Sequence, residues 1–336
     1  MNYNFNSGYG QMLMNQIASS VGPTMGRILV VQEDSDPTVN QNMISRTFVP
    51  DPDGFVRFYR TLEAAYAAAT TNANDVILLS GHTTHTLAAP IAWSKNRIHV
   101  IGMDGGDRLV QQGAKIQCAT AGTVSYVLKV TGVRNSFRNL KVIQASTVAT
   151  ALTVLEEGGE GNLYKNCTFT FGVVDNLDLT TAHEVLAGSD SATYLNCNFG
   201  TETLLTSAAR SVFHIDQVTA SQEFKSNILQ DCVFLISSSS STATFVRLDA
   251  IGDVLFSNLF RRCTFIASVD SAGGAAIAEA SQTGTSTVKG VLCYDQCAAF
   301  NVTDFSTATG GRNAATQVVA VSPTAGTAGV GVAPTA

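Results

Sequence analysis

The sequence has 336 residues, and 45% of them are hydrophobic, which is enough to build a sizeable core. Charged residues make up 14% of the chain, well below the roughly 25% of an average globular protein. The net charge is −6 at pH 7, and Arg261-Arg262 is the densest basic pair. This distribution excludes nucleic-acid binding, which needs concentrated positive charge to replace counterions on phosphates. No run of eighteen apolar residues occurs, so we expect no membrane-spanning helix.

The chain begins with an Asn-, Gln- and Ser-rich segment, residues 1–50. One stretch in it has the pattern of a strand: Arg27, Ile28, Leu29, Val30 and Val31. The first residues lack the basic and apolar parts of a secretion signal. The other end, residues 306–336, consists mainly of Gly, Ala, Thr and Val. Neither segment can build a core of its own. We expect both to be extended arms that lie on neighbouring subunits, with residues 27–31 as the interface strand.

A helix-then-strand unit follows the first arm. Residues 58–70 have a helical pattern with Leu62, Ala65, Tyr66 and Ala69 on one face, and a strand pattern over 75–81 comes directly after it. The open end of a stack of strands exposes apolar core and unpaired backbone, so a covering element is needed there. The helix is predicted to cap the first coil of a domain that spans residues 51–305.

A short phrase recurs in the second half of the chain, with successive cysteines 30, 35, 31 and 34 residues apart. Each copy has a cysteine followed closely by a phenylalanine: Cys167 and Phe169, Cys197 and Phe199, Cys232 and Phe234, Cys263 and Phe265, and the degraded copy Cys297 and Phe300. Residues two apart on a strand point to the same face. A fixed period, short strands and no helical pattern between them predict an all-β fold, a right-handed single-stranded parallel β-helix.

Stacked coils would bring these five cysteines into one ladder in the interior. Neighbouring coils lie about 4.8 Å apart, so equivalent residues of successive coils stack on one another. A buried cysteine behaves as a small apolar residue, and each cysteine here has a phenylalanine as partner rather than a histidine. We therefore interpret the ten residues as a structural core ladder; a metal-binding or redox ladder is the alternative.

These features resemble β-helical virion structural proteins of tailed bacteriophages. The resemblance lies in the strand Gly26–Val31, the approach Asp51–Phe58 and the helix-then-strand unit that runs to His82, while the Cys-Phe phrases are similar to pectin-lyase-like coils. The resemblance implies a capsid decoration or cement protein that forms a homotrimer, with the major capsid protein or other virion proteins as partners. It also implies a location on the capsid surface of the virion, after assembly in the host bacterial cytoplasm.

An enzyme with this fold would need carboxylates on the outer face of adjacent coils, since glycoside hydrolases use acid pairs roughly 5–10 Å apart. The candidate acids are scattered and form no recognisable motif: Asp175, Asp178, Glu184, Asp190, Asp216, Asp249 and Asp253. Glu156 and Glu157 begin a stretch that we interpret as a solvated bend. The sequence therefore predicts no catalytic residues and no cofactor.

The five histidines form no site by their spacing. His82 and His85 are three apart, so on a strand they face opposite sides, while His99, His183 and His214 are isolated. We expect no metal site. The sequence favours a non-enzymatic capsid protein; the alternatives are a tailspike-type receptor-binding protein or polysaccharide depolymerase and, less favoured, a secreted pectate-lyase-like enzyme. Proteins of all these kinds share one architecture, so the fold does not decide between them.

Overall fold

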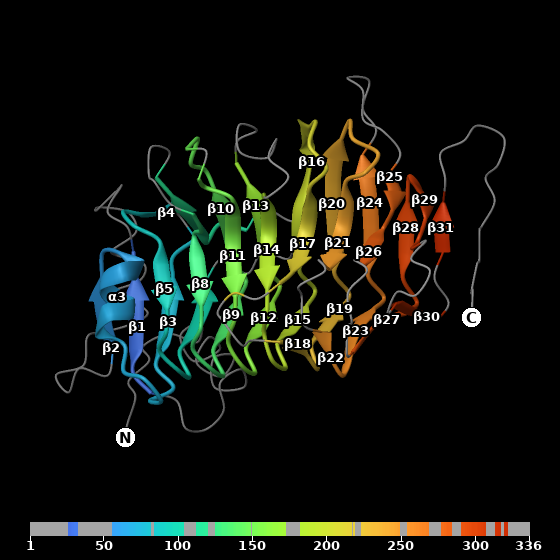
Figure 1. Ribbon diagram of the computed structural model, residues 1–336. Coiled ribbons are helices and arrows are strands. Elements are labelled where there is room, and N and C mark those ends of the chain that lie inside the picture. Colours follow the sequence, from blue (N-terminus) through green and yellow to red (C-terminus); the bar gives the residue numbers. More distant parts are fainter. Residues whose placement is uncertain are drawn as a thin grey trace.

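The strands of this protein stack in parallel along one long axis, as Figure 1 shows from the blue N-terminal to the red C-terminal coils. The computed structural model describes residues 26–32, 56–81, 84–103, 112–119, 125–148, 150–172, 182–216, 218, 223–248, 254–268, 277–283, 290–306, 313–316 and 319–321. Each strand pairs with the equivalent strand of the next coil. The predicted right-handed parallel β-helix is confirmed.

Three parallel sheets form the sides of the solenoid. Sheet A runs β2 (Val56–Tyr59), β1 (Ile28–Val31), β3 (Val76–Leu79), β6 (His99–Gly102), β9 (Ser136–Arg138), β12 (Leu163–Lys165), β15 (Thr193–Leu195), β19 (Ile228–Gln230), β23 (Ser257–Arg261), β27 (Val291–Asp295) and β30 (Asn313–Thr316). Sheet B runs β4 (Thr84–Leu87), β7 (Lys115–Cys118), β10 (Lys141–Gln144), β13 (Thr168–Phe171), β16 (Asn198–Thr206), β20 (Val233–Ser238), β24 (Thr264–Ser268), β28 (Ala298–Phe300) and β31 (Val319–Val321). Sheet C runs β5 (Ile91–Trp93), β8 (Leu128–Val130), β11 (Thr153–Glu157), β14 (His183–Ala187), β17 (Ser211–Ile215), β21 (Thr244–Leu248) and β26 (Ser281–Thr283). Two short pairs complete the set: β18 (Phe224–Lys225) with β22 (Val254–Leu255), and β25 (Ile277–Glu279) with β29 (Val302–Asp304).

The corner between sheets A and B explains the asparagines that precede Cys167, Cys197 and, one coil earlier, Leu140. Asn139, Asn166 and Asn196 occupy this corner with φ between 52° and 56°, a left-handed conformation that asparagine tolerates better than most residues. Their side chains also form a ladder. Asn166 Nδ2 donates to Asn139 Oδ1 at 3.1 Å, and Asn196 Nδ2 donates to Asn166 Oδ1 at 2.8 Å. The asparagines thus turn the chain and link successive coils.

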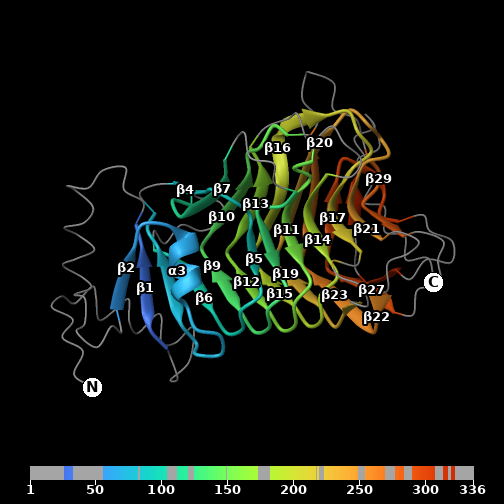
Figure 2. The ribbon, with the colours of Figure 1, turned by 60° about the vertical axis from the view of Figure 1, so that its left-hand side comes forward.

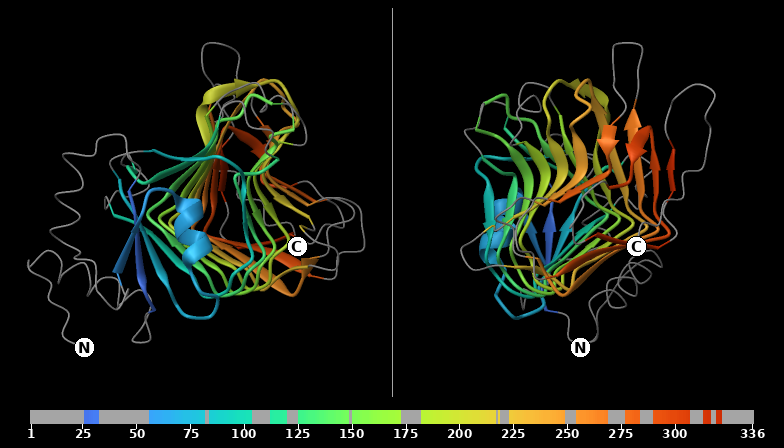
Figure 3. Two further views of the ribbon diagram at one scale, coloured as in Figure 1. Left: turned by 90° about the vertical axis from the view of Figure 1, so that its left-hand side faces the viewer. Right: turned by 45° about the vertical axis from the view of Figure 1, so that its right-hand side comes forward.

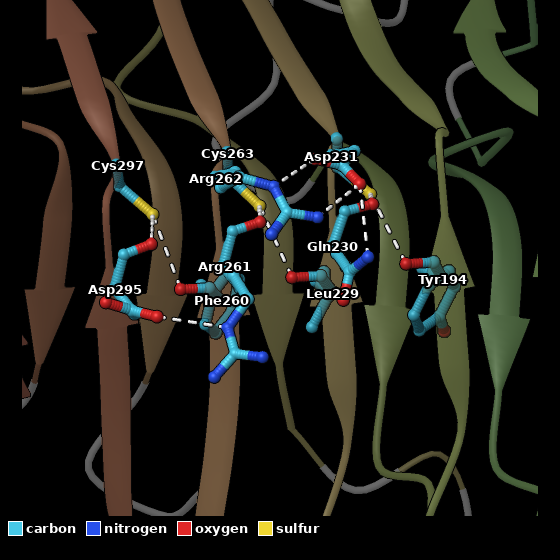
Figure 4. Close-up of polar contacts among 11 residues, drawn as sticks. Tyr194, Leu229, Gln230, Asp231, Phe260, Arg261, Arg262, Cys263, Asp295 and Cys297 are labelled. Carbon is cyan, nitrogen blue, oxygen red and sulfur yellow. Dashed lines mark hydrogen bonds and ion pairs between the residues drawn. The ribbon is translucent and has the colours of Figure 1, made fainter.

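The five cysteines of the repeated phrase lie in the interior directly after this corner. Each Sγ lies 3.4–3.6 Å from two carbonyl oxygens, one two residues earlier and one in the preceding coil. Figure 4 shows these contacts for Cys263 and Cys297. The thiols therefore act as weak donors to carbonyl groups at the corner. Beside them the rings of Phe169, Phe199, Phe234 and Phe265 stack with centroids 4.7–5.7 Å apart.

Phe300 departs from the expected core ladder. Its phrase has one extra residue after Cys297, so Ala299 pairs with Phe265 in the inward row. Phe300 instead pairs with Ile266 on the opposite face, and its side chain is 44% exposed. The expectation for Phe300 is corrected, because a three-residue spacing reverses the side of a strand on which a residue lies.

The helix α3 (Leu62–Ala68) lies across the N-terminal end of the stack, as the left-hand view of Figure 3 shows. It is shorter than the predicted 58–70, because residues 56–59 form strand β2. Thr61 caps its N-terminus by accepting from the N–H of Ala64. At its other end Lys95 Nζ donates to three carbonyl oxygens, those of residues 66, 67 and 69. No helix in the described part of the chain is long and apolar enough to cross a membrane.

The predicted interface strand lies inside the solenoid. β1 pairs with β2 and β3, and all four of its residues are fully buried. Arg27, just before β1, donates to both carboxylate oxygens of Asp75 at 2.8 Å. Contact of this strand with another subunit stays a prediction. At the C-terminal end β30 and β31 extend sheets A and B beyond residue 305; the other residues of the expected arms lie outside the described residues, apart from 26–32 and 306.

Candidate functional site

The outer face of sheet C carries two rows of mostly polar side chains. In several strands two consecutive residues belong to the core, such as Val212 with Phe213 and Phe245 with Val246. A β-bulge allows this arrangement, because the N–H groups of Phe245 and Val246 both donate to Ala280 O. The residues on either side of each pair face away from the core. The first outer row is Thr153, His183, Ser211 and Thr244, and the second outer row is Lys129, Glu156, Leu186, His214 and Arg247. Figure 2 shows their strands β11, β14, β17 and β21 side by side.

Three side chains of these rows form a hydrogen-bonded chain. Ser211 Oγ lies 3.0 Å from His183 Nδ1, and His183 Nε2 lies 2.8 Å from His214 Nδ1. All three residues are buried. When both imidazoles are neutral, one ring donates a proton to the other, and the tautomers set the direction of the chain. A proton can therefore pass between the hydroxyl and the two rings; we call this group the His–Ser relay.

The surroundings keep His183 neutral. Its burial lowers the pKa well below the ordinary value of 6.5, and the neighbouring His214 and the positive charges of Arg210 and Arg247 lower it further. A carbonyl contact with Ser211 O at 3.3 Å opposes this shift. The neutral imidazole of His183 can donate a hydrogen bond through one ring nitrogen and accept one through the other.

The second outer row places charged groups on the same face as the relay. Lys129 Nζ and Glu156 Oε2 form an ion pair of 2.8 Å. Arg247 lies next to His214 in the register of β17 and β21. Glu156 and His214 are separated by the coil that carries Leu186, so two coil spacings, about 10 Å, lie between them. One face thus offers a carboxylate, an imidazole and two cations.

A buried ion pair lies directly behind the relay. Glu184 follows His183, Arg210 precedes Ser211, and Arg210 Nη1 donates to Glu184 Oε2 at 2.8 Å. Both side chains are completely buried. Burial raises the pKa of Glu184, while the charge of Arg210 and its hydrogen bond oppose the shift. Among the acidic candidates that the structure describes, Glu184 lies next to the relay in sequence, directly after His183.

The other acidic candidates lie elsewhere. Asp190 forms an ion pair with Lys225 at 2.9 Å on the corner between sheets C and A. Asp216 follows β17 and donates its backbone N–H to Ala187 O. Four candidates lie outside the described residues: Asp175, Asp178, Asp249 and Asp253.

Two further histidines in the described part of the chain, His85 and His99, have other partners than the relay. His85 is buried and its Nε2 lies 2.9 Å from Ser80 O. His99 lies on the outer side of sheet A with Nδ1 2.8 Å from Ser136 Oγ, and burial lowers its pKa to about 4. His82 lies outside the described residues. Among the residues that the structure describes, no group of three or more His, Cys, Asp or Glu side chains could hold a metal ion.

The expected solvated bend is in part a buried site. Glu156 and Glu157 belong to β11, and Glu157 is completely buried. Its carboxylate accepts from the N–H of Gly159, from Asn162 Nδ2 and from the hydroxyl of Tyr164. Burial raises its pKa to about 7, although these hydrogen bonds lower it in part. The bend was misinterpreted because a run of acidic and glycine residues looks solvated, whereas the bulge turns Glu157 inward.

Sequence reasoning also missed an asparagine ladder at the corner between sheets C and A. Its members are buried and accept backbone N–H groups of neighbouring coils: Asn135, Asn162, Asn227 and Asn258. The signal was present, because each of these asparagines stands two positions before an inward residue of sheet A.

Comparisons with known proteins bear on this architecture. No family model matches the sequence, and no curated protein matches it. A solved pectin methylesterase in complex with a hexasaccharide is 12% identical, with a TM-score of 0.53 over 91% of this chain and 92% of that chain. The pectin methylesterase from Aspergillus niger is 10% identical, with a TM-score of 0.53 over 89% and 86%. The enzyme from Erwinia chrysanthemi is 13% identical, with a TM-score of 0.51 over 88% and 90%.

The fold is a pectin-lyase-like β-helix. At these identities the likeness establishes the fold alone. The three solved structures named above are pectin methylesterases, and this counts against the expectation of a non-enzymatic protein. No comparison points to a phage particle, so the virion location and the trimer stay predictions.

Proposed function

We propose that this protein is a polysaccharide-active enzyme whose reaction centre is the His–Ser relay on the outer face of sheet C. The observation that carries the proposal is the continuous contact from Ser211 through His183 to His214, made by adjacent coils. A buried polar chain of this kind has a large desolvation cost, and perturbed titratable groups of this kind gather at functional sites.

The roles follow from position. His214 is the member of the relay that lies on the second outer row, so it is the general acid or base that meets the substrate. His183 passes a proton to or from it, and Ser211 holds the orientation of His183. Glu156, about 10 Å away, is the second polar group, and Lys129 forms an ion pair with it.

The geometry of the solenoid suits an extended polymer as substrate. The second outer row presents one side chain per coil along the long axis, from Lys129 to Arg247. A polysaccharide lying along this axis would meet a new side chain at each coil. The fold supports the same class of substrate, because one solved protein with this architecture is a pectin methylesterase in complex with a hexasaccharide.

The test is an assay of the purified protein on bacterial capsular and O-antigen polysaccharides, pectins and glucans. We expect new reducing ends from at least one of them, which marks cleavage of the chain. If the protein binds a polymer but no polymer yields new reducing ends or releases ester groups, the proposal is contradicted.

The phage setting is a separate proposal that rests on the sequence resemblance. Within this phage setting, a tailspike-type depolymerase is the role that is compatible with enzymatic activity. Light scattering of the purified protein tests the expected trimer, and mass spectrometry of purified virions tests the location.

A further inference from the structure

The buried ion pair of Glu184 and Arg210 is an exception within its own sheet. In sequence Glu184 lies between His183 and Val185. These two residues pair with Thr153 and Leu155 of β11. The residue of β11 that is equivalent to Glu184 is therefore Val154, a core residue. The equivalent residue of β17 is Val212, also in the core. Two charges have thus replaced apolar side chains at one level of the solenoid.

This exchange brings little stability. Desolvation of two charges often exceeds their attraction, and well-packed apolar residues in their place are often neutral or stabilising. The pair is also incompletely hydrogen-bonded: Glu184 Oε1 and the Nε and Nη2 atoms of Arg210 have no hydrogen-bond partner among the residues that the structure describes. A stabilising role therefore does not account for the pair, whereas a role in fixing geometry does.

The location of the pair indicates which geometry it fixes. On the outer side of the sheet His183 contacts Ser211, and one residue away on the inner side Glu184 contacts Arg210. The coils of β14 and β17 are thus linked by one contact on the outer face of the sheet and by another on its inner face. The charges that face His183 from the surrounding elements are those of Arg210 and Arg247, and His214 is its titratable neighbour.

We propose that Glu184 and Arg210 are positioning residues, which lock β14 against the start of β17 so that His183 stays in contact with Ser211 and His214. Arg210 has a second effect, because its charge disfavours a proton on His183. The proposal rests on the proposed function for its catalytic meaning, but the geometry that it describes can be tested without any activity.

The experiment uses the full chain with an apolar replacement of both residues, Glu184→Val with Arg210→Leu. The replacements are the residues found at the equivalent positions of the β11 coil, where Val154 corresponds to Glu184 and Leu152 to Arg210. Because apolar pairs replace buried ion pairs well, we expect the double variant to fold and to melt at or above the wild-type temperature. The single variant Glu184→Gln serves as the comparison, since it leaves the charge of Arg210 buried and unpaired and should melt lower.

The readout that a merely structural role would not change is the titration of the five histidines, followed by NMR of protein labelled with ¹⁵N-histidine. In the wild type the pKa of His183 should lie well below its ordinary value, and in the folded double variant this pKa should rise. The single variant Arg210→Lys keeps the positive charge, so His183 should titrate in it as in the wild type. An unchanged titration of His183 in the folded double variant would overturn the proposal.

Kinetics separates this inference from the proposed function. On a polysaccharide that the wild type cleaves, the double variant should lose about tenfold or more in kcat with KM unchanged, because the relay is displaced rather than the binding surface. If the wild type cleaves nothing while the titration of His183 shifts as described, the positioning role stands and the enzymatic proposal fails. If both kcat and the titration stay at wild-type values, the positioning role is wrong.

Discussion

His183 Nε2 and His214 Nδ1 lie 2.8 Å apart on adjacent coils of the solenoid, although 31 residues separate them in the sequence. Their ring centroids are 4.2 Å apart with the planes tilted by 60°. The contact arises because His183 stands before the two consecutive core residues of β14 and His214 stands after those of β17. The stacking of adjacent coils thus brings two histidines that are isolated in the sequence into one relay.

The pH dependence of stability should reveal Glu157. Its pKa is about 7 in the folded protein, against 4.5 as the ordinary value. A raised pKa means that the folded state favours the protonated carboxyl, so this contribution to stability is fully present below pH 4.5 and is lost as the pH rises to 7. This difference in pKa corresponds to about 3 kcal/mol in the free energy of unfolding.

The check is the free energy of unfolding of the wild type and of Glu157→Gln between pH 5 and pH 8. The amide cannot ionise and can still accept from Asn162 and Tyr164. We expect the wild type to lose stability relative to the variant across this range. Parallel curves for the two proteins would show that Glu157 does not titrate there.

Thiol labelling tests the interior cysteine ladder. Cys293 lies on the outer row of sheet A and is partly exposed, whereas the other six cysteines are buried. Burial also raises the pKa of the Cys197 and Cys263 thiols well above the ordinary value, which leaves little reactive thiolate.

In the native protein a thiol-specific chromogenic reagent should therefore label one residue rapidly and the others only after unfolding. The variant Cys293→Ser should abolish the rapid phase and leave the slow phase. Rapid labelling of several thiols in native Cys293→Ser protein would contradict the interior placement.

The asparagine ladder should contribute measurably to stability. Asn227 is completely buried; its Oδ1 accepts from the N–H of Ala192 at 2.7 Å, and its Nδ2 donates to Ser189 O at 2.8 Å. Asn227→Ala leaves both backbone groups without these partners, at a cost of about 3 kcal/mol. The control is Thr193→Ala on the outer side of β15, which should change the unfolding free energy by less than about 0.5 kcal/mol. Equal effects in denaturant unfolding would refute the role of the ladder.

The sequence was informative about the fold because the β-helix repeats. The spacing of Cys167, Cys197, Cys232 and Cys263 identifies the coil, and a two-residue step identifies the side of the strand. The same rule failed at Phe300, where one extra residue reverses the side. The helix boundary was too early because residues 56–59 pair with β1, a contact between segments distant in the sequence.

The candidate site was much less predictable. His183 and His214 face the same side because each stands next to two consecutive inward residues, and neither histidine marks this break in the alternation. Loop lengths between coils also vary, so the residues that become neighbours across β14 and β17 have no fixed spacing. The sequence indicated the likeness to carbohydrate-modifying enzymes only as an alternative, through the similarity of its Cys-Phe phrases to pectin-lyase-like coils, and the solved neighbours are 10–13% identical.

The central claim is tested most directly by the rate of polysaccharide cleavage by His214→Gln, with His99→Gln as matched control. Both histidines are buried on outer faces of the solenoid, but His99 contacts Ser136 and lies outside the relay. Loss of a general acid–base residue costs roughly 10²–10⁴ in rate. We predict a fall in kcat of about 100-fold or more for His214→Gln and a wild-type rate for His99→Gln. A folded His214→Gln variant that cleaves at the wild-type rate would contradict the account.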